Sequence, residues 1–230
     1  MKQIYFFVFL FFSTFTFAQE WEEFTSPPAS LLADHTFGFA FGNTGYLVAG
    51  NTSDGYTAEF QEYDAETDSW TKKDDFPGGA RGFAIGTQYE GKAYFGFGSD
   101  NFGPLNDLWV FDPETDEWTQ LAECPCSPRN HPGMIAVGGE IFVGLGSGNF
   151  GNVIDWWRYN IETDSWSSMP DFPSPRRHHP FQFHDGTYMY AGFGHGDNFI
   201  SVTFNDWDHN GRRRRDRRNW IRHSASGKTG

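Results

Sequence analysis

The chain repeats itself every 48 residues, and this period restricts its fold more than any other feature. Four sets of residues keep the spacing without an insertion: Trp70, Trp118 and Trp166; Asp64, Asp112 and Asn160; Arg81, Arg129 and Arg177; and Gly50, Gly98, Gly146 and Gly194. A fixed period of this length is typical of solenoids and propellers. The sequence therefore predicts equivalent units over about residues 35–80, 81–128, 129–176 and 177–207.

The second unit indicates what each repeat folds into. Short segments rich in aromatic and β-branched residues alternate with turns rich in Gly, Pro, Asn and Asp, over residues 82–88, 93–98, 108–112 and 118–122. This alternation predicts an antiparallel meander of four strands. Gly96 and Gly98 would place bare backbone where strands crowd together, and the repeated Trp side chains would fill the space between neighbouring sheets.

Three features of the repeat resemble a known family. The paired glycines, such as Gly96 and Gly98, the turns that begin at Asp64 or Asp112, and the spaced Trp residues are similar to kelch repeats, which belong to the galactose oxidase and kelch-type propeller superfamily. The family's two glycines are usually adjacent, whereas one residue separates them here. The resemblance implies an all-β kelch-type β-propeller of four-stranded antiparallel blades, either about four in number or a fragment of a larger propeller.

The two ends of the chain differ from the repeats. Residues 21–28 resemble the segments that begin at the repeated Trp residues, so we expect an N-terminal strand that completes the last blade. Before it, the apolar run over residues 4–12 predicts a signal peptide over residues 1–18 and a secreted or periplasmic protein. That run is too short for a spanning helix, so we expect no membrane span after cleavage. Residues 211–230 are basic, and we expect a disordered or frame-shifted tail.

The charge of the repeat region excludes nucleic acid as its partner. Eight Lys or Arg stand against 29 Asp or Glu between residues 19 and 210, which gives this stretch a net charge of −21. Phosphate backbones require clustered positive charge. We therefore expect the acidic body to bind no nucleic acid, and we expect a monomer.

Only two cysteines are present, Cys124 and Cys126, on either side of Pro125. A disulfide between them would be strained, because relaxed disulfides need a narrow range of Cα separations and the proline limits adjustment. We expect two free thiols in a turn. No further Cys or His lies at a spacing typical of a zinc site around them.

Candidate ligand-binding residues gather on one predicted face of the propeller. In a four-stranded meander, the loop between the second and third strands and the link to the next blade emerge on the same side. The candidates on this loop-bearing face are Arg81, Arg129, Arg177, His131, His179, Asp100, Asn101, Asn149, His195, Asp197 and Asn198. Arg offers a planar fork for carboxylates. The alternative is that each Arg bonds carbonyl or carboxylate groups of the adjacent blade and fixes the contacts between blades.

The sequence gives no catalytic constellation. We identify neither a Ser-His-Asp arrangement nor a phosphate-binding loop. The two cysteines lie in a link where we find no Cys-linked Tyr and no pair of His ligands of the kind that the copper enzyme galactose oxidase uses. His178, His179, His184 and His195 raise the question of a metal, but neighbours on a strand point to opposite faces. We expect no catalytic residue, no metal and no cofactor.

These observations favour an exported binding module that recognises a protein or a glycan through the loop-bearing face. The alternative is a secreted carbohydrate-processing enzyme similar to the sialic-acid epimerases of the kelch group. In that case Arg129, His131, Arg177 and His179 would perform acid–base chemistry. Resemblance of fold alone does not decide between these functions.

Overall fold

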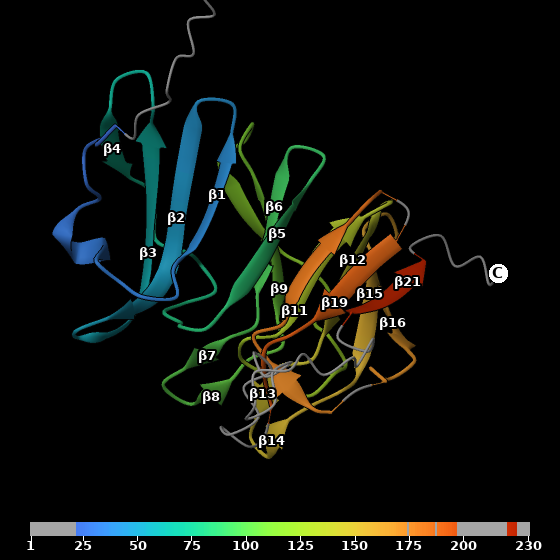
Figure 1. The fold of residues 1–230 in the computed structure, drawn as a ribbon. Helices are drawn as coiled ribbons and strands as arrows, with labels where there is room; N and C mark the ends of the chain where they lie inside the picture. Colours follow the sequence, from blue (N-terminus) through green and yellow to red (C-terminus); the bar gives the residue numbers. More distant parts are fainter. Residues whose placement is uncertain (1–21, 174, 187, 197–219, 225–230) are drawn as a thin grey trace, which may run out of the picture.

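The fold consists of antiparallel sheets that follow one another along the chain (Figure 1). It is seen in a computed structural model that describes residues 22–173, 175–186, 188–196 and 220–224. The helical content of this part is one short 3-10 turn, η1 (Ala29–Leu31). No helix of the described residues has the length and apolar character needed to cross a membrane.

Each of the first three repeats forms a four-stranded blade, as predicted, with neighbouring strands in chain order. The first blade contains β1 (Phe37–Phe41), β2 (Thr44–Thr52), β3 (Gly55–Asp64) and β4 (Ser69–Lys72). The second contains β5 (Ile85–Tyr89), β6 (Lys92–Gly96), β9 (Leu108–Asp112) and β10 (Glu117–Gln120). The third contains β11 (Gly133–Val137), β12 (Glu140–Gly144), β15 (Trp156–Asn160) and β16 (Ser165–Met169). The predicted all-β meander is therefore confirmed.

Two small hairpins connect the second and third strands of blades two and three. They are formed by β7 (Ser99–Asp100) with β8 (Gly103–Pro104), and by β13 (Ser147–Gly148) with β14 (Gly151–Asn152). Both lie at the same end of their blades in Figure 1. The loops expected on one face of the propeller are therefore found there.

The fourth repeat forms a three-stranded sheet of β18 (Phe181–His184), β19 (Tyr188–Gly192) and β21 (Trp220–Ser224), beside a short pair, β17 (Arg177–His178) and β20 (His195–Gly196). β21 pairs along all of β19 in antiparallel register. These five residues lie within the segment predicted to be a disordered or frame-shifted tail, and that call stays a prediction. Pairing satisfies the backbone groups on an edge of β19 that would otherwise stay open. The rest of residues 211–230 lies outside the described part, as does the predicted signal peptide.

Aromatic side chains fill the space between blades, as the sequence indicated. Phe60, Phe111 and Phe95 are fully buried, and the ring of Trp118 packs against all three. The same pair recurs on the two outer strands of each complete blade: the ring centroids are 4.9 Å apart for Tyr63–Trp70, 5.1 Å for Phe111–Trp118 and 5.2 Å for Tyr159–Trp166. Burying rings of this size dominates core energetics, so the aromatic ladder is explained by packing.

The repeated glycines and turn carboxylates also serve the fold. A Cβ atom on Gly98, whose φ is +83°, would lie 2.5 Å from the carbonyl oxygen of Gly82, so no larger residue fits. In the outer turns, the side-chain oxygen of Asp64 accepts a hydrogen bond from the backbone N–H of Glu66, and Asp112 does the same with Glu114. The hydrogen bonds that Asp64 accepts lower its pKa, and the bond from the backbone N–H of Glu66 has the largest effect. The acidic turns are hairpin chemistry, as predicted.

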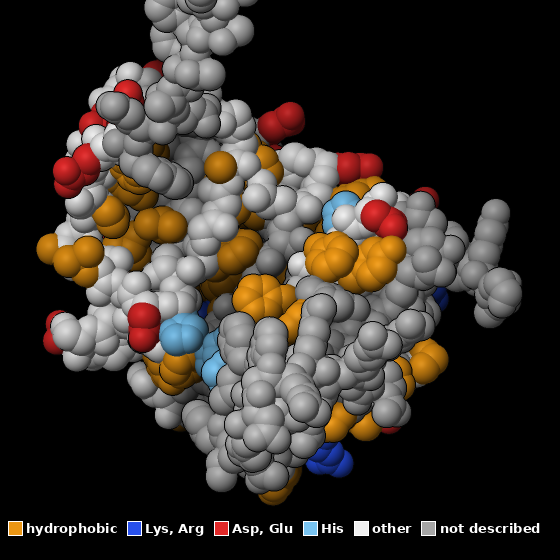
Figure 2. Space-filling view, viewed as in Figure 1, with side chains coloured by type: hydrophobic (Ala, Val, Ile, Leu, Met, Phe, Trp, Pro, Cys, Tyr) orange, Lys and Arg blue, Asp and Glu red, His pale blue; other side chains and the backbone are white. Residues whose placement is uncertain are grey.

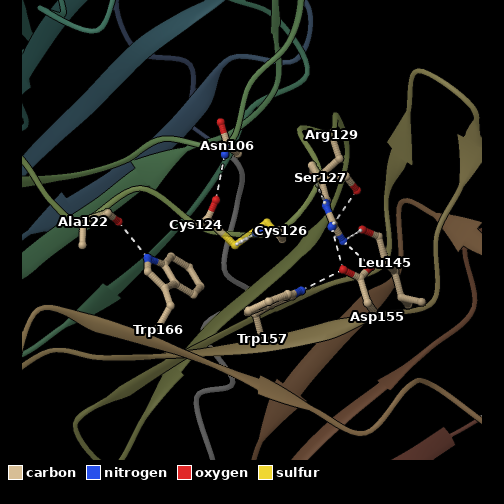
Figure 3. The surroundings of a disulfide bond; sticks show 10 residues. All are labelled: Asn106, Ala122, Cys124, Cys126, Ser127, Arg129, Leu145, Asp155, Trp157 and Trp166. Atoms are coloured by element: carbon tan, nitrogen blue, oxygen red, sulfur yellow. Dashed lines mark hydrogen bonds and ion pairs between the residues drawn. A yellow bond between two sulfur atoms is a disulfide. The ribbon is translucent and has the colours of Figure 1, made fainter.

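Cys124 and Cys126 form a disulfide, so the prediction of free thiols is wrong (Figure 3). Their Cα atoms are 5.1 Å apart, which lies inside the range of about 4.4–6.8 Å found in relaxed disulfides. The turn around Pro125 thus brings the two residues to a suitable distance. Both cysteines are buried in the core between blades two and three, and Asn106 donates a 2.7 Å hydrogen bond to the carbonyl oxygen of Cys124.

The segment before the first blade lies along the outer hairpin of that blade. Thr25 donates its N–H to Asp68 and accepts a 2.8 Å hydrogen bond from Trp70. Ala122, which follows the outermost strand of blade two, makes the same two bonds with Asp164 and Trp166. Residues 22–28 contain no strand, but Thr25 occupies the place of a residue after an outermost strand. That residues 21–28 complete the last blade stays a prediction.

Candidate functional site

The links between blades and the hairpins lie together on the loop-bearing face, because each link pairs with the hairpin of the blade that it enters. Gly82 bridges to Ser99 in blade two, and Asn130 bridges to Ser147 in blade three. In the fourth unit, β17 pairs with β20 in the same way. This pairing holds the candidate residues of the links and loops at one end of the sheets.

Two of the candidate arginines are buried inside the blades. The side chains of Arg81 and Arg129 are 1% and 0% exposed. Arg81 forms a two-pronged ion pair with Asp107 at 2.6 and 2.8 Å, and Arg129 forms the same pair with Asp155 at 2.7 and 2.8 Å (Figure 3). Both guanidiniums thus make structural contacts, as in the alternative, except that each bonds its own blade and not the adjacent one. A ligand-binding role for the two arginines stays a prediction.

Arg177 follows the same pattern in the part of its surroundings that is described. It is 5% exposed, and its guanidinium donates to the carbonyl oxygens of Phe193 at 2.9 Å and Pro175 at 3.0 Å. Arg129 bonds the equivalent carbonyl oxygens of Leu145 and Ser127. An Arg that occurs in every unit thus stabilises that unit, because each guanidinium bonds the link before a blade to the end of the second strand of the same blade.

The polar candidates on the hairpins line the rim of this face. Asp100 accepts hydrogen bonds from the N–H groups of Phe102 and Gly103 at 2.8 and 3.0 Å, and so shapes its own hairpin. Asn101 and Asn149 are exposed near the hairpin tips, and His195 is exposed in β20. Asp197 and Asn198, also predicted as ligand-binding residues, lie outside the described residues.

The sequence reasoning missed two exposed aromatic residues at the hairpin tips. The side chains of Phe102 and Phe150 are fully exposed, although most other phenylalanines of the described part are at least half-buried. They lie 48 residues apart, so the repeat was the signal that could have found them. The two hairpins are neighbours, since a Cβ atom on Gly103 would lie 4.0 Å from the Asn149 side-chain oxygen.

Four equivalent residues of the links meet beside the hairpins. These residues, one from each repeat, are His35, Phe83, His131 and His179, and we call them the axial cluster. All four have left-handed backbones, with φ of 53°, 60°, 48° and 54°. The N–H of His131 donates to the carbonyl oxygen of Phe83, and the N–H of His179 donates to that of His131, each at 3.0 Å.

The rings of the axial cluster are in mutual contact. The ring centroids of His131 and His179 are 3.5 Å apart, and those of His35 and His131 are 5.0 Å apart. One ring nitrogen from each of the three histidines lies within 4.8 Å of the others. His131 and His179 were predicted as site residues, whereas His35 was missed because Phe83 interrupts the ladder of histidines.

Burial keeps the inner histidines uncharged. Burial, together with the neighbouring imidazoles, lowers the pKa of His131 to about 3 and that of His179 to about 4. Both rings are therefore neutral at neutral pH. The Nδ1 atom of His35 lies 3.1 Å from the carboxylate of Asp34.

The three histidines of the axial cluster line a pocket of about 630 Å³. Its walls also carry apolar side chains, among them Phe37, Phe181 and Phe193. Figure 2 shows histidine side chains reaching the surface beside hydrophobic ones on this side of the molecule. The pocket thus combines imidazole rings with apolar walls, and ligand sites commonly combine a few polar groups with apolar ones.

The arrangement defines the class of protein. Repeated four-stranded meanders, joined in sequence and packed through aromatic faces, are the blades of a β-propeller. A model of the kelch motif matches residues 98–125. The solved structure of YjhT is similar with a TM-score of 0.61 and 18% sequence identity. The match covers 71% of this chain and 60% of that one, so this chain spans only part of the length of YjhT.

The chain therefore has the fold of a kelch-type β-propeller over its described blades, and residues 98–125 carry a kelch motif, as the glycines, turns and tryptophans indicated. No curated protein matches it. The structural likeness establishes the fold alone, and function has to be argued from the site.

Proposed function

We propose that this chain is an exported binding module that recognises a partner protein through its loop-bearing face. The observation that carries the proposal is the full exposure of Phe102 and Phe150 at equivalent positions of neighbouring hairpins. Large exposed apolar side chains that gather on one face mark interaction sites more often than scattered ones do.

The chemistry of the two side chains favours a protein over a glycan. A phenyl ring has no polar group with which to bond sugar hydroxyls, whereas it fills an apolar pocket on a protein surface. Asn101 and Asn149, next to the two rings, supply the polar rim that typically surrounds an apolar contact. Burying one such ring contributes roughly 1.5–3 kcal/mol.

Two observations support export. The apolar run over residues 4–12, followed by small and polar residues, is typical of a cleaved signal. The disulfide between Cys124 and Cys126 is stable in oxidising compartments and rare in the cytosol. Mass spectrometry of the protein from extracellular and periplasmic fractions should find an N-terminus at Gln19. A cytosolic protein that keeps Met1 or Lys2 would contradict export.

The partner is tested in two steps. A photo-crosslinking residue at Asn101 should capture a secreted or surface protein, which is then purified. Its affinity is measured for the wild type, for Phe102→Ala with Phe150→Ala, and for the control Phe24→Ala. Phe24 is also exposed, at 59%, but lies beside the outer turn of blade one. Loss of two buried rings should weaken binding by roughly 100-fold, and the control should bind normally.

Either of two results would overturn the proposal. The double variant would bind the captured protein as tightly as the wild type, or a glycan array would show the only saturable ligand to be a sugar. Unfolding of the variants is not expected, because both rings are fully exposed and contribute little to the folded state.

The alternative of an acid–base enzyme has weaker support. Of the four residues proposed for its chemistry, Arg129 is fully buried in its ion pair with Asp155. The pKa values of about 3 and 4 leave His131 and His179 too weakly basic for proton transfer at neutral pH, where a catalytic pKa near 7 works best. The geometry therefore favours binding.

A further inference from the structure

The axial cluster contains buried nitrogen atoms that nothing in the described part of the chain satisfies. Nε2 of His131 and Nδ1 of His179 are both inaccessible to water, and neither has a hydrogen-bond partner among the described residues. Buried polar atoms are almost always paired, so an unpaired one requires an explanation. Two of them in touching rings, with a third imidazole alongside, indicate a ligand that accepts lone pairs.

We propose that His35, His131 and His179 bind a Zn²⁺ ion at the centre of the loop-bearing face. The site goes beyond the partner-binding function and does not depend on it. Three imidazoles are a donor set that suits zinc and leaves the fourth tetrahedral position open to water or to a ligand in the pocket.

The separation of the nitrogens fits such a site after small rotations of the rings. The three ligand atoms lie within 4.8 Å of one another. In a tetrahedral zinc site with Zn–N bonds of about 2.0–2.1 Å, the ligand nitrogens are about 3.3 Å apart. Each nitrogen therefore moves by roughly an ångström, which side-chain torsions achieve without a change of the backbone.

The carboxylate of Asp34 contacts His35, one of the three proposed ligands, on the ring nitrogen that would not bind the metal. Asp34 lies 3.1 Å from Nδ1 of His35 and can accept a hydrogen bond from that nitrogen. This contact fixes the tautomer and leaves Nε2 with a free lone pair, as carboxylates commonly do behind metal-bound histidines. Asp34 is held to the first blade by two backbone hydrogen bonds with Asn51, at 2.8 and 2.9 Å.

Ring packing alone does not explain the cluster. Stacking of His131 on His179 would stabilise the faces of the rings but would leave the edge nitrogens buried and unpaired. Phe83, at the equivalent position of the second repeat, shows that an apolar ring fits the same backbone. Histidine at the other three positions therefore indicates a function of the imidazole nitrogens, which phenylalanine lacks.

The direct test is titration of the chelator-treated, full-length secreted chain with ZnCl₂ by calorimetry. We expect one ion per chain with micromolar or tighter affinity. His131→Asn, His179→Asn and His35→Asn should each weaken binding by at least 100-fold. Asn is chosen because it tolerates the left-handed backbone of these positions. His184→Asn is the matched control, since His184 is an exposed histidine on β18 and should leave binding unchanged.

A second variant keeps the test decisive if the Asn variants fold poorly. Phe83→His places a fourth imidazole in the same ring of residues, where the Phe83 ring centroid lies 4.6 Å from that of His131. It should bind Zn²⁺ at least 10-fold more tightly than the wild type. The proposal is refuted if the wild type binds no zinc below millimolar concentration. It is equally refuted if the three Asn variants bind as the wild type does, or if Phe83→His does not tighten binding.

Discussion

Replacement of Arg129 by Met tests whether the buried ion pairs hold the links to their blades. The change removes both bonds to Asp155 and those to the carbonyl oxygens of Leu145 and Ser127 (Figure 3). Asp155 would keep the hydrogen bond from the indole N–H of Trp157, at 2.7 Å. Removing one partner of a buried pair costs about 3–5 kcal/mol. The Asp155 side chain is 32% exposed, so water relieves part of this cost and we expect about 3 kcal/mol.

The assay is urea unfolding followed by tryptophan fluorescence and far-UV circular dichroism, for the wild type, Arg129→Met, Asp155→Asn and the double variant. The double variant should recover part of the loss, because it leaves no unpaired charge. The matched control is Arg158→Met, because Arg158 is 38% exposed and pairs with Glu140 at 3.3 Å. Such a surface pair contributes about 0–1 kcal/mol.

The pH dependence of the stability loss in Arg129→Met provides the result that would refute the reasoning. Burial alone would raise the pKa of Asp155, but the hydrogen bonds and charge of Arg129 outweigh it and lower the pKa. This contribution is present above the unfolded pKa and is lost as the pH falls through the folded value. In Arg129→Met burial is opposed only by the remaining hydrogen bonds, chiefly that from Trp157, so the carboxyl accepts a proton more easily and the penalty should shrink towards pH 4. A penalty below about 1 kcal/mol at pH 7, or one that grows in acid, would refute the reasoning.

Three further predictions concern the fold and the axial cluster. Gly98→Ala should destabilise the protein by at least 2 kcal/mol more than Gly91→Ala does, as measured by urea unfolding. Both glycines have positive φ, but only Gly98 faces backbone atoms. Left-handed strain, which both variants share, alone costs roughly 1–2 kcal/mol. Metal-free protein should lose stability as the pH falls from about 6.5 towards 4, by roughly 1.4 kcal/mol per pH unit for each of the two inner histidines. The pKa values of His131 and His179 are lowered, so the unfolded chain binds protons first, and His131→Asn should flatten the slope. Alkylation of denatured, unreduced protein should find no free thiol if the two cysteines are paired.

The repeat allowed the blades to be predicted because a period is visible without any knowledge of contacts. Each strand of the second blade falls in a segment that the alternation of aromatic and turn residues marked out. A structural role for the arginines followed from the same logic, since Arg81 and Arg129 occur once per unit, although each bonds its own blade and not the adjacent one. Residues that recur with the 48-residue period thus make equivalent contacts in successive blades.

The features that the sequence did not reveal depend on distances between distant segments. His35 could not be placed beside His131 until the links were seen to meet. The disulfide depends on how the turn at Pro125 sets the Cα separation of its neighbours, which a spacing of two residues does not determine. The pairing of β21 with β19 likewise depends on an open strand edge, and nothing in the basic composition of residues 211–230 indicated it.

The backbone conformation of the axial cluster helps to decide whether its histidines are present for a conformational or a chemical reason. Histidine is enriched among left-handed residues, so positive φ could by itself explain three histidines. A second set of equivalent residues argues against this explanation: Ala49, Phe97, Leu145 and Phe193 have φ of 57°, 57°, 58° and 58°, and all are apolar. The repeat thus imposes a left-handed backbone at both of these positions, and the second shows that this backbone alone does not select histidine. Three imidazoles therefore meet because of what their nitrogens do, and zinc binding is the chemistry that uses them.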